Sequence, residues 1–217
     1  MKCLICGQNL SVGIGFSKLF SIQNTFCDEC LTKLEPVLDG CPNCGKRGTS
    51  TTCEDCLYWE SLNCNIKNFS LYYYNEFAKE LINEIKYNGN LRLLQAFENE
   101  VRKKLMMLKA HKVIPVPLHM HKLQVRGFNQ SKEIAKMLPN KIIDCLVKQK
   151  DITQSKRNKT ERLMANDFTF RENDNLQGEK ILLIDDIYTT GGTVHQIGKL
   201  LFNVGVMEIV SFTLFRS

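Results

Sequence analysis

Two carboxylates and a loop rich in hydroxyls and glycine follow an apolar run in the stretch 181–194, which reads ILLIDDIYTTGGTV. Glycine lets the backbone approach a ligand closely, and successive N–H groups at the start of a helix favour an anion. Threonine hydroxyls can complete a cradle for a phosphate group. The residues expected to bind this phosphate are Thr189, Thr190, Gly191, Gly192 and Thr193.

Asp185 and Asp186 stand directly before this loop and are expected to face a sugar. Their oxygens can accept hydrogen bonds from ribose 2′- and 3′-hydroxyls, directly or through Mg²⁺, which prefers oxygen ligands. The loop lacks the Gly-Lys-Thr ending of a Walker loop and the Gly-x-Gly-x-x-Gly spacing of dinucleotide-binding folds. The residues therefore favour a phosphorylated ribose as the ligand.

A second kind of chemistry is indicated near the N-terminus, where eight of the ten cysteines form four Cys-x-x-Cys units. This spacing lets two thiolates reach one tetrahedral zinc ion, and a reducing cytosol does not favour disulfides. The segment looks duplicated, because each half has a Cys-x-x-Cys-Gly knuckle and then an acidic second pair. Sequential pairing predicts one zinc site from Cys3, Cys6, Cys27 and Cys30 and another from Cys41, Cys44, Cys53 and Cys56. An interleaved cross-brace is the alternative.

Both zinc sites are expected to be structural rather than catalytic, since four protein ligands leave no open position for water. Residues 1–62 are expected to form this zinc-finger module, and residues 63–217 a larger domain. The module can serve only to stabilise folding, or it can also grip nucleic acid or a partner, and the residues are compatible with both.

The larger segment has the alternation of helices and strands that is typical of an α/β fold. Apolar residues recur at helical spacing over 75–88, between a possible cap at Asn75 and a stop at Gly89. Further helices are predicted over 91–108, around 134–138 and over 194–204, and strands over 113–117, 181–184 and 208–215. Continuous apolar runs such as 181–184 indicate buried parallel strands.

The stretch 181–194 closely resembles the PRPP-binding motif of type I phosphoribosyltransferases. Two further blocks are similar to those of the ComF/ComFC competence proteins, as is the cysteine-rich N-terminus. One is VIPVPL at 113–118 with RGFNQS at 126–131, and the other is Gln154 with Arg157, Glu161, Arg162 and Asn166 before Phe168. The resemblance covers nearly the whole chain in the right order. It implies a type I phosphoribosyltransferase-like parallel sheet flanked by helices, with a small N-terminal zinc-finger module.

The resemblance also implies a role in DNA uptake during natural transformation. Such a protein is expected to bind incoming single-stranded DNA in the cytoplasm, beside a DNA-translocation helicase or recombination proteins, and to hold PRPP or a nucleotide in its pocket. Asp185 and Asp186 would be the catalytic pair and would meet the ribose or its Mg²⁺. The loop after Pro117 would lie where pyrophosphate binds, and Arg126 is the candidate for a further anion contact.

The polar and basic stretch from Lys148 to Asn166 is expected either to form a mobile hood over the ligand or to be a path for a phosphodiester backbone, a solvated loop being the alternative. The nucleic-acid candidates are Lys148, Lys150, Lys156, Arg157, Lys159 and Arg162. Candidates for stacking on bases are Tyr72, Tyr73, Tyr74, Tyr87, Phe128 and Tyr188, although core packing is the commoner role of such residues.

The formal net charge of +6 permits a phosphate or nucleic-acid partner without requiring one. No apolar run is long enough to span a bilayer and the N-terminus lacks the pattern of a signal peptide, so a cytoplasmic location without membrane insertion is expected. The main alternative to a competence protein is an active phosphoribosyltransferase that transfers phosphoribose from PRPP to a nitrogen acceptor, and a pure scaffold is a third possibility. No residue at 208–217 identifies such an acceptor.

Overall fold

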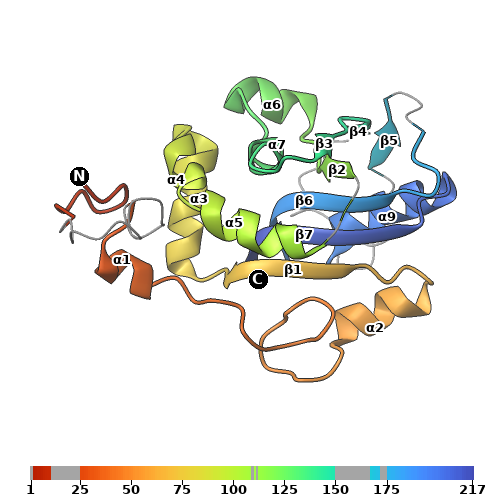
Figure 1. Cartoon of the computed structure of the whole chain (residues 1–217), viewed down its shortest axis with the longest axis horizontal. Coiled ribbons are helices and arrows are strands. Elements are labelled where there is room, and N and C mark those ends of the chain that lie inside the picture. The colour runs from red at the N-terminus through yellow and green to blue at the C-terminus, as the bar shows by residue number, and fades with distance from the viewer. Residues whose placement is uncertain (1, 11–24, 109, 111, 150–166, 172–174) are drawn as a thin grey trace.

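A five-stranded parallel sheet forms the centre of the protein in the computed structural model, which describes residues 2–10, 25–108, 110, 112–149, 167–171 and 175–217 (Figure 1). The strand order is β1-β7-β6-β2-β3, and every neighbouring pair is parallel. The strands are β1 (Lys67–Tyr73), β2 (Lys112–Pro115), β3 (Lys141–Ile142), β6 (Lys180–Tyr188) and β7 (Glu208–Arg216). β4 (Leu146–Lys148) and β5 (Phe168–Phe170) form a separate antiparallel pair. This architecture confirms the predicted α/β class.

Helices cover both faces of the sheet because the central strand is apolar on both sides. Along β6, Leu182 and Ile184 belong to one buried cluster, together with α3 (Glu76–Asn88), whereas Ile181 and Leu183 belong to a second, together with α9 (Gly192–Asn203). Alternate side chains of a strand point to opposite faces, so the continuous apolar run serves two cores. Residues 185–188, which carry the carboxylates, continue β6 beyond the predicted end of the strand at 184.

The helix over 76–88 forms as predicted. The Asn75 side chain accepts a hydrogen bond from Ala78 N at 2.9 Å, and Gly89 ends α3 in the left-handed conformation with φ of +68°. The predicted single helix over 91–108 is wrong, because it is divided into α4 (Leu91–Gln95), α5 (Glu98–Leu105) and a short 3-10 turn, η3 (Met106–Leu108). At the break, Phe97 is fully buried and its ring lies 5.7 Å from Phe26 and 6.2 Å from Phe215. Burial of the Phe97 ring in the core thus interrupts the helix that the spacing alone predicts.

Two helices lie above the sheet beside β2 in Figure 1, α6 (Met120–Arg126) and α7 (Gln130–Ala135). α7 ends earlier than the predicted helix around 134–138. The edge strand β1, which the sequence did not predict, pairs with β7 along its whole length. In the part of the chain that the structure describes, no helix has both the length and the apolar character needed to cross a membrane.

The cysteine-rich segments pack against the sheet domain. They contain two short helices, α1 (Asp28–Thr32) and α2 (Glu54–Ser61). Phe26 belongs to the same buried cluster as α3, and Trp59 in α2 is 1% exposed and lies against His195 of α9. The domain boundary at residue 62 stays a prediction.

Candidate functional site

The predicted phosphate loop lies between the end of β6 and the start of α9. Gly191 caps α9 with φ of +82°, a conformation that L side chains rarely adopt. A Cβ atom at this position would lie 2.3 Å from the Tyr188 hydroxyl and 2.8 Å from His195 Nδ1, so no side chain fits. The loop therefore requires glycine here for two independent reasons.

The N-terminus of α9 is open to a ligand. Among the described residues, no side chain caps this helix, whose first turn begins at Gly192 and Thr193. Thr189 is exposed and Thr190 is half-buried, so hydroxyls flank the helix end. Free N–H groups and the helix dipole at such an end favour an anion.

Asp185 and Asp186 point into a polar network built by α3, α6 and α7. Ser131 Oγ donates to Asp185 Oδ1 at 3.0 Å, and Gln130 Nε2 donates to Asp186 Oδ1 at 3.3 Å. Lys86, near the end of α3, forms an ion pair with the other oxygen of Asp186. The structure thus places the two predicted carboxylates together at the carboxyl end of β6, where ligands of parallel sheets generally bind.

The two carboxyl groups differ in acidity. Burial, together with the neighbouring charge of Asp186, raises the pKa of Asp185 to about 7. Burial also acts to raise the pKa of Asp186, but the Lys86 ammonium outweighs it and the pKa of Asp186 is lowered. At neutral pH Asp186 is therefore the charged member of the pair, and Asp185 is the member that can change protonation.

Arg126 joins this network through Gln130, whose side-chain oxygen accepts a hydrogen bond from Arg126 Nη1 at 2.6 Å. Burial lowers the pKa of Arg126, and the charge of Asp186 acts against that shift. Arg126, the predicted anion contact, therefore lies beside Asp185 and Asp186.

A cavity of about 310 Å³ opens beside these residues, and most of its polar lining is basic. Its walls are formed by the end of α3 and by α6, and its lining residues are Lys86, Tyr87, Gly89, His121, Lys122, Val125 and Arg126. The Tyr87 ring is 76% exposed at its rim. A positive wall with an exposed ring is suited to a phosphate group and a base.

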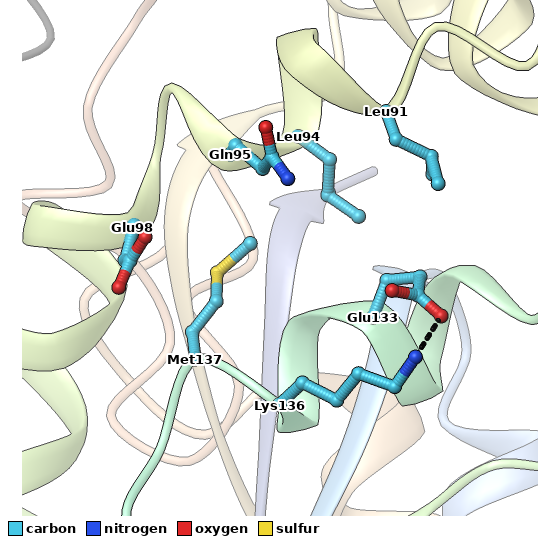
Figure 2. A pocket seen from close by; sticks show the side chains of 7 residues that line it. All are labelled: Leu91, Leu94, Gln95, Glu98, Glu133, Lys136 and Met137. Carbon is cyan, nitrogen blue, oxygen red and sulfur yellow. Dashed lines mark hydrogen bonds and ion pairs between the residues drawn. The ribbon is translucent and has the colours of Figure 1, made fainter.

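A second cavity, of about 190 Å³, lies between α4, the start of α5 and α7 (Figure 2). Glu133 and Lys136 face its interior from α7 and the residue after it and form an ion pair at 2.7 Å. Neither Asp185 nor Asp186 nor any residue of the predicted phosphate loop lines this cavity, so we do not assign it to the site.

The cysteines form the two sets that sequential pairing predicts, and the cross-brace alternative is wrong for the described residues. We call them the Cys3 cluster (Cys3, Cys6, Cys27 and Cys30) and the Cys41 cluster (Cys41, Cys44, Cys53 and Cys56). Within each cluster the four sulfur atoms lie within 4.8 Å of one another. Individual Sγ–Sγ distances are 3.6 Å for Cys6 and Cys27, 3.8 Å for Cys41 and Cys56 and 3.7 Å for Cys44 and Cys53.

These distances fit a tetrahedral metal ion, since a Zn–S bond of about 2.3 Å separates the ligand sulfurs by roughly 3.8 Å. In the Cys41 cluster one thiol is acidified, whereas burial raises the pKa of Cys53, and hydrogen bonding with Cys44 together with burial raises the pKa of Cys56. Hydrogen bonding from Cys56 and the charge of Arg216 lower the pKa of Cys44 to about 4, and Lys46 lies 3.0 Å from Asp55 next to the cluster. Four soft sulfur ligands with nearby cations suit zinc in a closed structural site.

The predicted nucleic-acid residues lie mostly in a part of the chain that the structure does not describe. Lys148 ends β4, and its ammonium lies 5.3 Å from the centre of the Phe168 ring. The other five, Lys150, Lys156, Arg157, Lys159 and Arg162, are outside the described residues. Lys148 alone therefore has a described position, on the small β4–β5 sheet.

Most of the aromatic candidates pack into the protein. Tyr73 and Tyr188 are buried, and Tyr72 and Tyr74 pack against the ring of Phe215. Phe128 is half-buried and lines a separate cavity of about 230 Å³ next to Pro117. Tyr87 is the candidate left with a large exposed ring.

Several residues at the acidic pair were not assigned a role from the sequence. Gln130 and Ser131 lie in the RGFNQS block, so their position in a motif was a usable signal. Lys86 belongs to the helix over 76–88, on which no pattern separates it from an ordinary solvated lysine. Trp59 and Arg216, which contact the phosphate loop and the residue before it, also gave no sequence signal.

Comparison with known proteins agrees with this geometry. Residues 123–217 match the family model described as a phosphoribosyl transferase domain, which includes Arg126, the acidic pair and the phosphate loop. The chain is 32% identical over 220 residues to "Competence protein ComFC" of Streptococcus pneumoniae, covering 100% of both chains. It is 32% identical over 228 residues to "Competence protein ComFC" of Bacillus subtilis, covering 99% of this chain and 95% of that protein. It is also 25% identical over 236 residues to "Competence protein F" of Haemophilus influenzae, covering 100% of this chain and 97% of that protein.

The chain thus combines a parallel sheet, an acidic pair, the predicted phosphate loop and two four-cysteine clusters, and it matches these relatives from end to end. The chain belongs to the ComFC family of competence proteins.

Proposed function

We propose that the protein is a cytoplasmic competence protein of natural transformation, which binds single-stranded DNA and holds PRPP or another 5′-phosphorylated ribose in its pocket. One observation carries the proposal. The carboxyl end of β6 brings together an uncapped helix N-terminus, an acidic pair and a basic cavity, in a chain similar over its full length to competence proteins.

The parts of the pocket match the parts of a phosphorylated ribose. Thr189 to Thr193 and the first N–H groups of α9 bind the 5′-phosphate, and Asp185 and Asp186 accept hydrogen bonds from the ribose hydroxyls. Arg126 and Lys86 lie where they can neutralise a pyrophosphate group. The carboxylate oxygens also suit Mg²⁺, which would neutralise charge on the pyrophosphate when bound.

DNA binding is supported by the rim of the same cavity. Tyr87 offers an exposed ring to a base, and Lys122 and Arg126 on α6 offer charge to the phosphates. A strand that follows this rim runs next to the ribose pocket, so a 5′-terminal phosphate and the chain behind it can be bound together. The basic stretch 148–166 is a second proposed contact for the strand.

Each four-cysteine cluster is proposed to hold one structural Zn²⁺, on the basis of the sulfur geometry. The protein is further proposed to work beside a DNA-translocation helicase or recombination proteins. Affinity purification of the tagged protein from competent cells, with untransformable cells as control, tests that contact.

Binding to a labelled single strand, measured by fluorescence anisotropy at two salt concentrations with and without Mg-PRPP, tests the main proposal. We expect salt-sensitive DNA binding that PRPP changes, since the two ligands share the Arg126 side of the pocket. An absence of DNA binding beside tight PRPP binding would favour the alternative, an active phosphoribosyltransferase. The alternative is supported by the match to the transferase family model, and release of pyrophosphate from PRPP by the purified protein would establish turnover.

A further inference from the structure

Trp59 contacts the phosphate loop directly although it belongs to the cysteine-rich segment. It lies in α2, three residues after Cys56, and it is the single tryptophan of the chain. The indole Nε1 donates a hydrogen bond to the carbonyl oxygen of Thr190 at 2.9 Å. The same ring stacks on His195 of α9, with the ring centres 4.3 Å apart and the planes 3° from parallel.

His195 holds the next carbonyl of the loop. Its Nδ1 lies 2.8 Å from the carbonyl oxygen of Gly191, which can only accept, so Nδ1 carries the proton and donates. Burial lowers the pKa of His195 to about 4, so the ring is neutral at physiological pH. Of these two successive carbonyls, that of Thr190 is held from α2, and that of Gly191 is held from within α9, where it also accepts from the His195 backbone N–H at 2.9 Å.

This arrangement orients the opposite ends of the same peptide groups. In a planar trans peptide the C=O and the following N–H point in opposite directions. Because the Thr190 carbonyl points toward Trp59, the N–H group of Gly191 points away from it, whereas the N–H group of Gly192 is oriented by the first turn of α9, on which Trp59 acts only by stacking on His195. Those N–H groups are among the donors proposed to bind the phosphate.

Arg216 makes a second connection between the Cys41 cluster and the loop. The buried guanidinium donates through Nε to the Cys44 carbonyl at 2.8 Å and through Nη2 to Cys44 Sγ at 3.3 Å. Through Nη1 it donates to the Tyr188 carbonyl at 3.2 Å, at the last residue of β6 before the loop. One side chain thus binds both a cluster sulfur and the base of the loop.

Close packing keeps α9 against the segment that follows α2. A Cβ atom at Gly198 would lie 2.2 Å from Ile66 Cδ1, so the helix approaches this segment as closely as glycine allows. The Cys3 cluster has a different neighbourhood, since Cys3 and Cys30 belong to the buried cluster formed with α3 and α5. The two cysteine clusters therefore differ in their relation to the pocket.

We propose that the Cys41 cluster acts as a clamp on the phosphate loop, with Trp59 and Arg216 as positioning residues that hold the loop N–H groups ready for the anion. The clamp rests on the proposed function, because it requires that the loop binds a phosphorylated ligand. Metal bound at the Cys41 cluster then supports ligand affinity and not only folding.

The test compares three zinc-loaded, full-length proteins, wild type, Trp59→Phe and Leu57→Ala, in calorimetric titrations with Mg-PRPP. Phenylalanine keeps a ring for His195 but lacks the N–H donor, whereas Leu57 lies in the same helix and is 53% exposed. We expect Trp59→Phe to weaken PRPP binding about 5- to 10-fold, as for the loss of one buried hydrogen bond, and Leu57→Ala to stay within about 2-fold of wild type. Zinc content and thermal midpoint, measured for all three, identify any variant that has lost its fold.

Fluorescence of the single tryptophan supplies an independent readout in the wild-type protein, and we expect PRPP to change it because the Thr190 carbonyl that accepts from Trp59 belongs to the same peptide group as the Gly191 N–H. Equal PRPP affinity of Trp59→Phe and wild type would overturn the clamp and leave the proposed function standing. Failure of wild type to bind PRPP would overturn the proposed pocket and the clamp with it.

Discussion

Lys86 at the end of α3 forms an ion pair with Asp186 at the end of β6, and the side chains of both residues are largely buried, at 18% and 8% exposed. The pair joins a helix from one face of the sheet to the carboxylates of the candidate site. It makes Asp186 the charged carboxylate and leaves Asp185 with the raised pKa. The difference between two adjacent aspartates is therefore set by a lysine from another element.

Replacing Lys86 by Met is expected to destabilise the protein by about 2–3 kcal/mol, because a buried carboxylate loses its partner. Lys79→Met is the matched control, since Lys79 lies in the same helix and pairs with Glu76 at an exposed site. Urea denaturation measures both. A Lys86→Met change no larger than that of Lys79→Met would show that the ion pair contributes nothing. The double variant Lys86→Met with Asp186→Asn is expected to recover part of the loss.

The pH dependence of the free energy of unfolding is expected to reflect the ionisation of Asp185. Its folded-state pKa, about 7, lies above the unfolded value of about 3.9, so the folded protein binds the extra proton between these values. The Asp185 contribution to stability is therefore most favourable below about pH 4 and is lost as pH rises through about 7. Asp185→Asn, which cannot ionise, should be more stable than wild type by about 1–3 kcal/mol at pH 8. This advantage should shrink toward pH 5 in thermal or urea unfolding, and an advantage that stays constant with pH would contradict the assignment.

Removal of metal ligands is expected to affect the two cysteine clusters unequally. Cys44 is 1% exposed and its sulfur accepts a hydrogen bond from Arg216, whereas Cys6 is exposed. Cys44→Ser should lower the bound zinc from two ions to one per chain and reduce the thermal midpoint by about 10 °C. Cys6→Ser should lower zinc content equally with a smaller thermal effect. A colorimetric zinc assay and thermal denaturation measure these quantities, and a larger loss in Cys6→Ser would contradict the prediction.

Local signals in the sequence predicted much of the fold. Helix α3 has both its cap at Asn75 and its stop at Gly89 in the sequence, and the apolar run of β6 marks a strand buried on both faces. The break between α4 and α5 at Phe97 has no proline or glycine to mark it in the sequence. It results from packing of the Phe97 ring against Phe26 and Phe215. Such a contact joins distant segments and cannot be inferred from helical spacing.

The residues of the candidate site likewise fall into those that a local motif predicts and those that only the fold brings together. Asp185, Asp186 and the loop through Thr193 form one continuous motif, so their proximity follows from the sequence. Lys86 and Trp59 come from helices far away in the chain, and only the folded arrangement brings them to the acidic pair and the loop. The cysteine pairing could be predicted because duplication leaves a local pattern.

Gly191→Ala is expected to disrupt the phosphate loop. The alanine backbone would have to keep a φ of +82°, and its Cβ would lie 2.3 Å from the Tyr188 hydroxyl and 2.8 Å from His195 Nδ1. We expect PRPP affinity to fall more than about 10-fold, with a loss of stability of about 2 kcal/mol. Gly178→Ala is the control, because Gly178 also has a positive φ but no atom within 4 Å of the added Cβ. Calorimetry with Mg-PRPP and urea denaturation measure both variants, and equal effects would show that strain alone, not the clash, determines the cost.

Tyr87 is expected to contribute to DNA binding by stacking, because its ring is 76% exposed on the rim of the basic cavity. Tyr87→Ala should weaken binding of a labelled single strand by about 10-fold, as for the loss of one stacked base, and should leave the salt dependence unchanged. Lys122→Gln should instead reduce the slope of affinity against salt, because it removes a charge from the path of the phosphates. Met107→Ala is the control, since Met107 is equally exposed at 77% but does not line this cavity. If Tyr87→Ala and Met107→Ala bind the strand alike, the strand does not follow this rim, and the basic stretch 148–166 becomes the remaining candidate for the DNA contact.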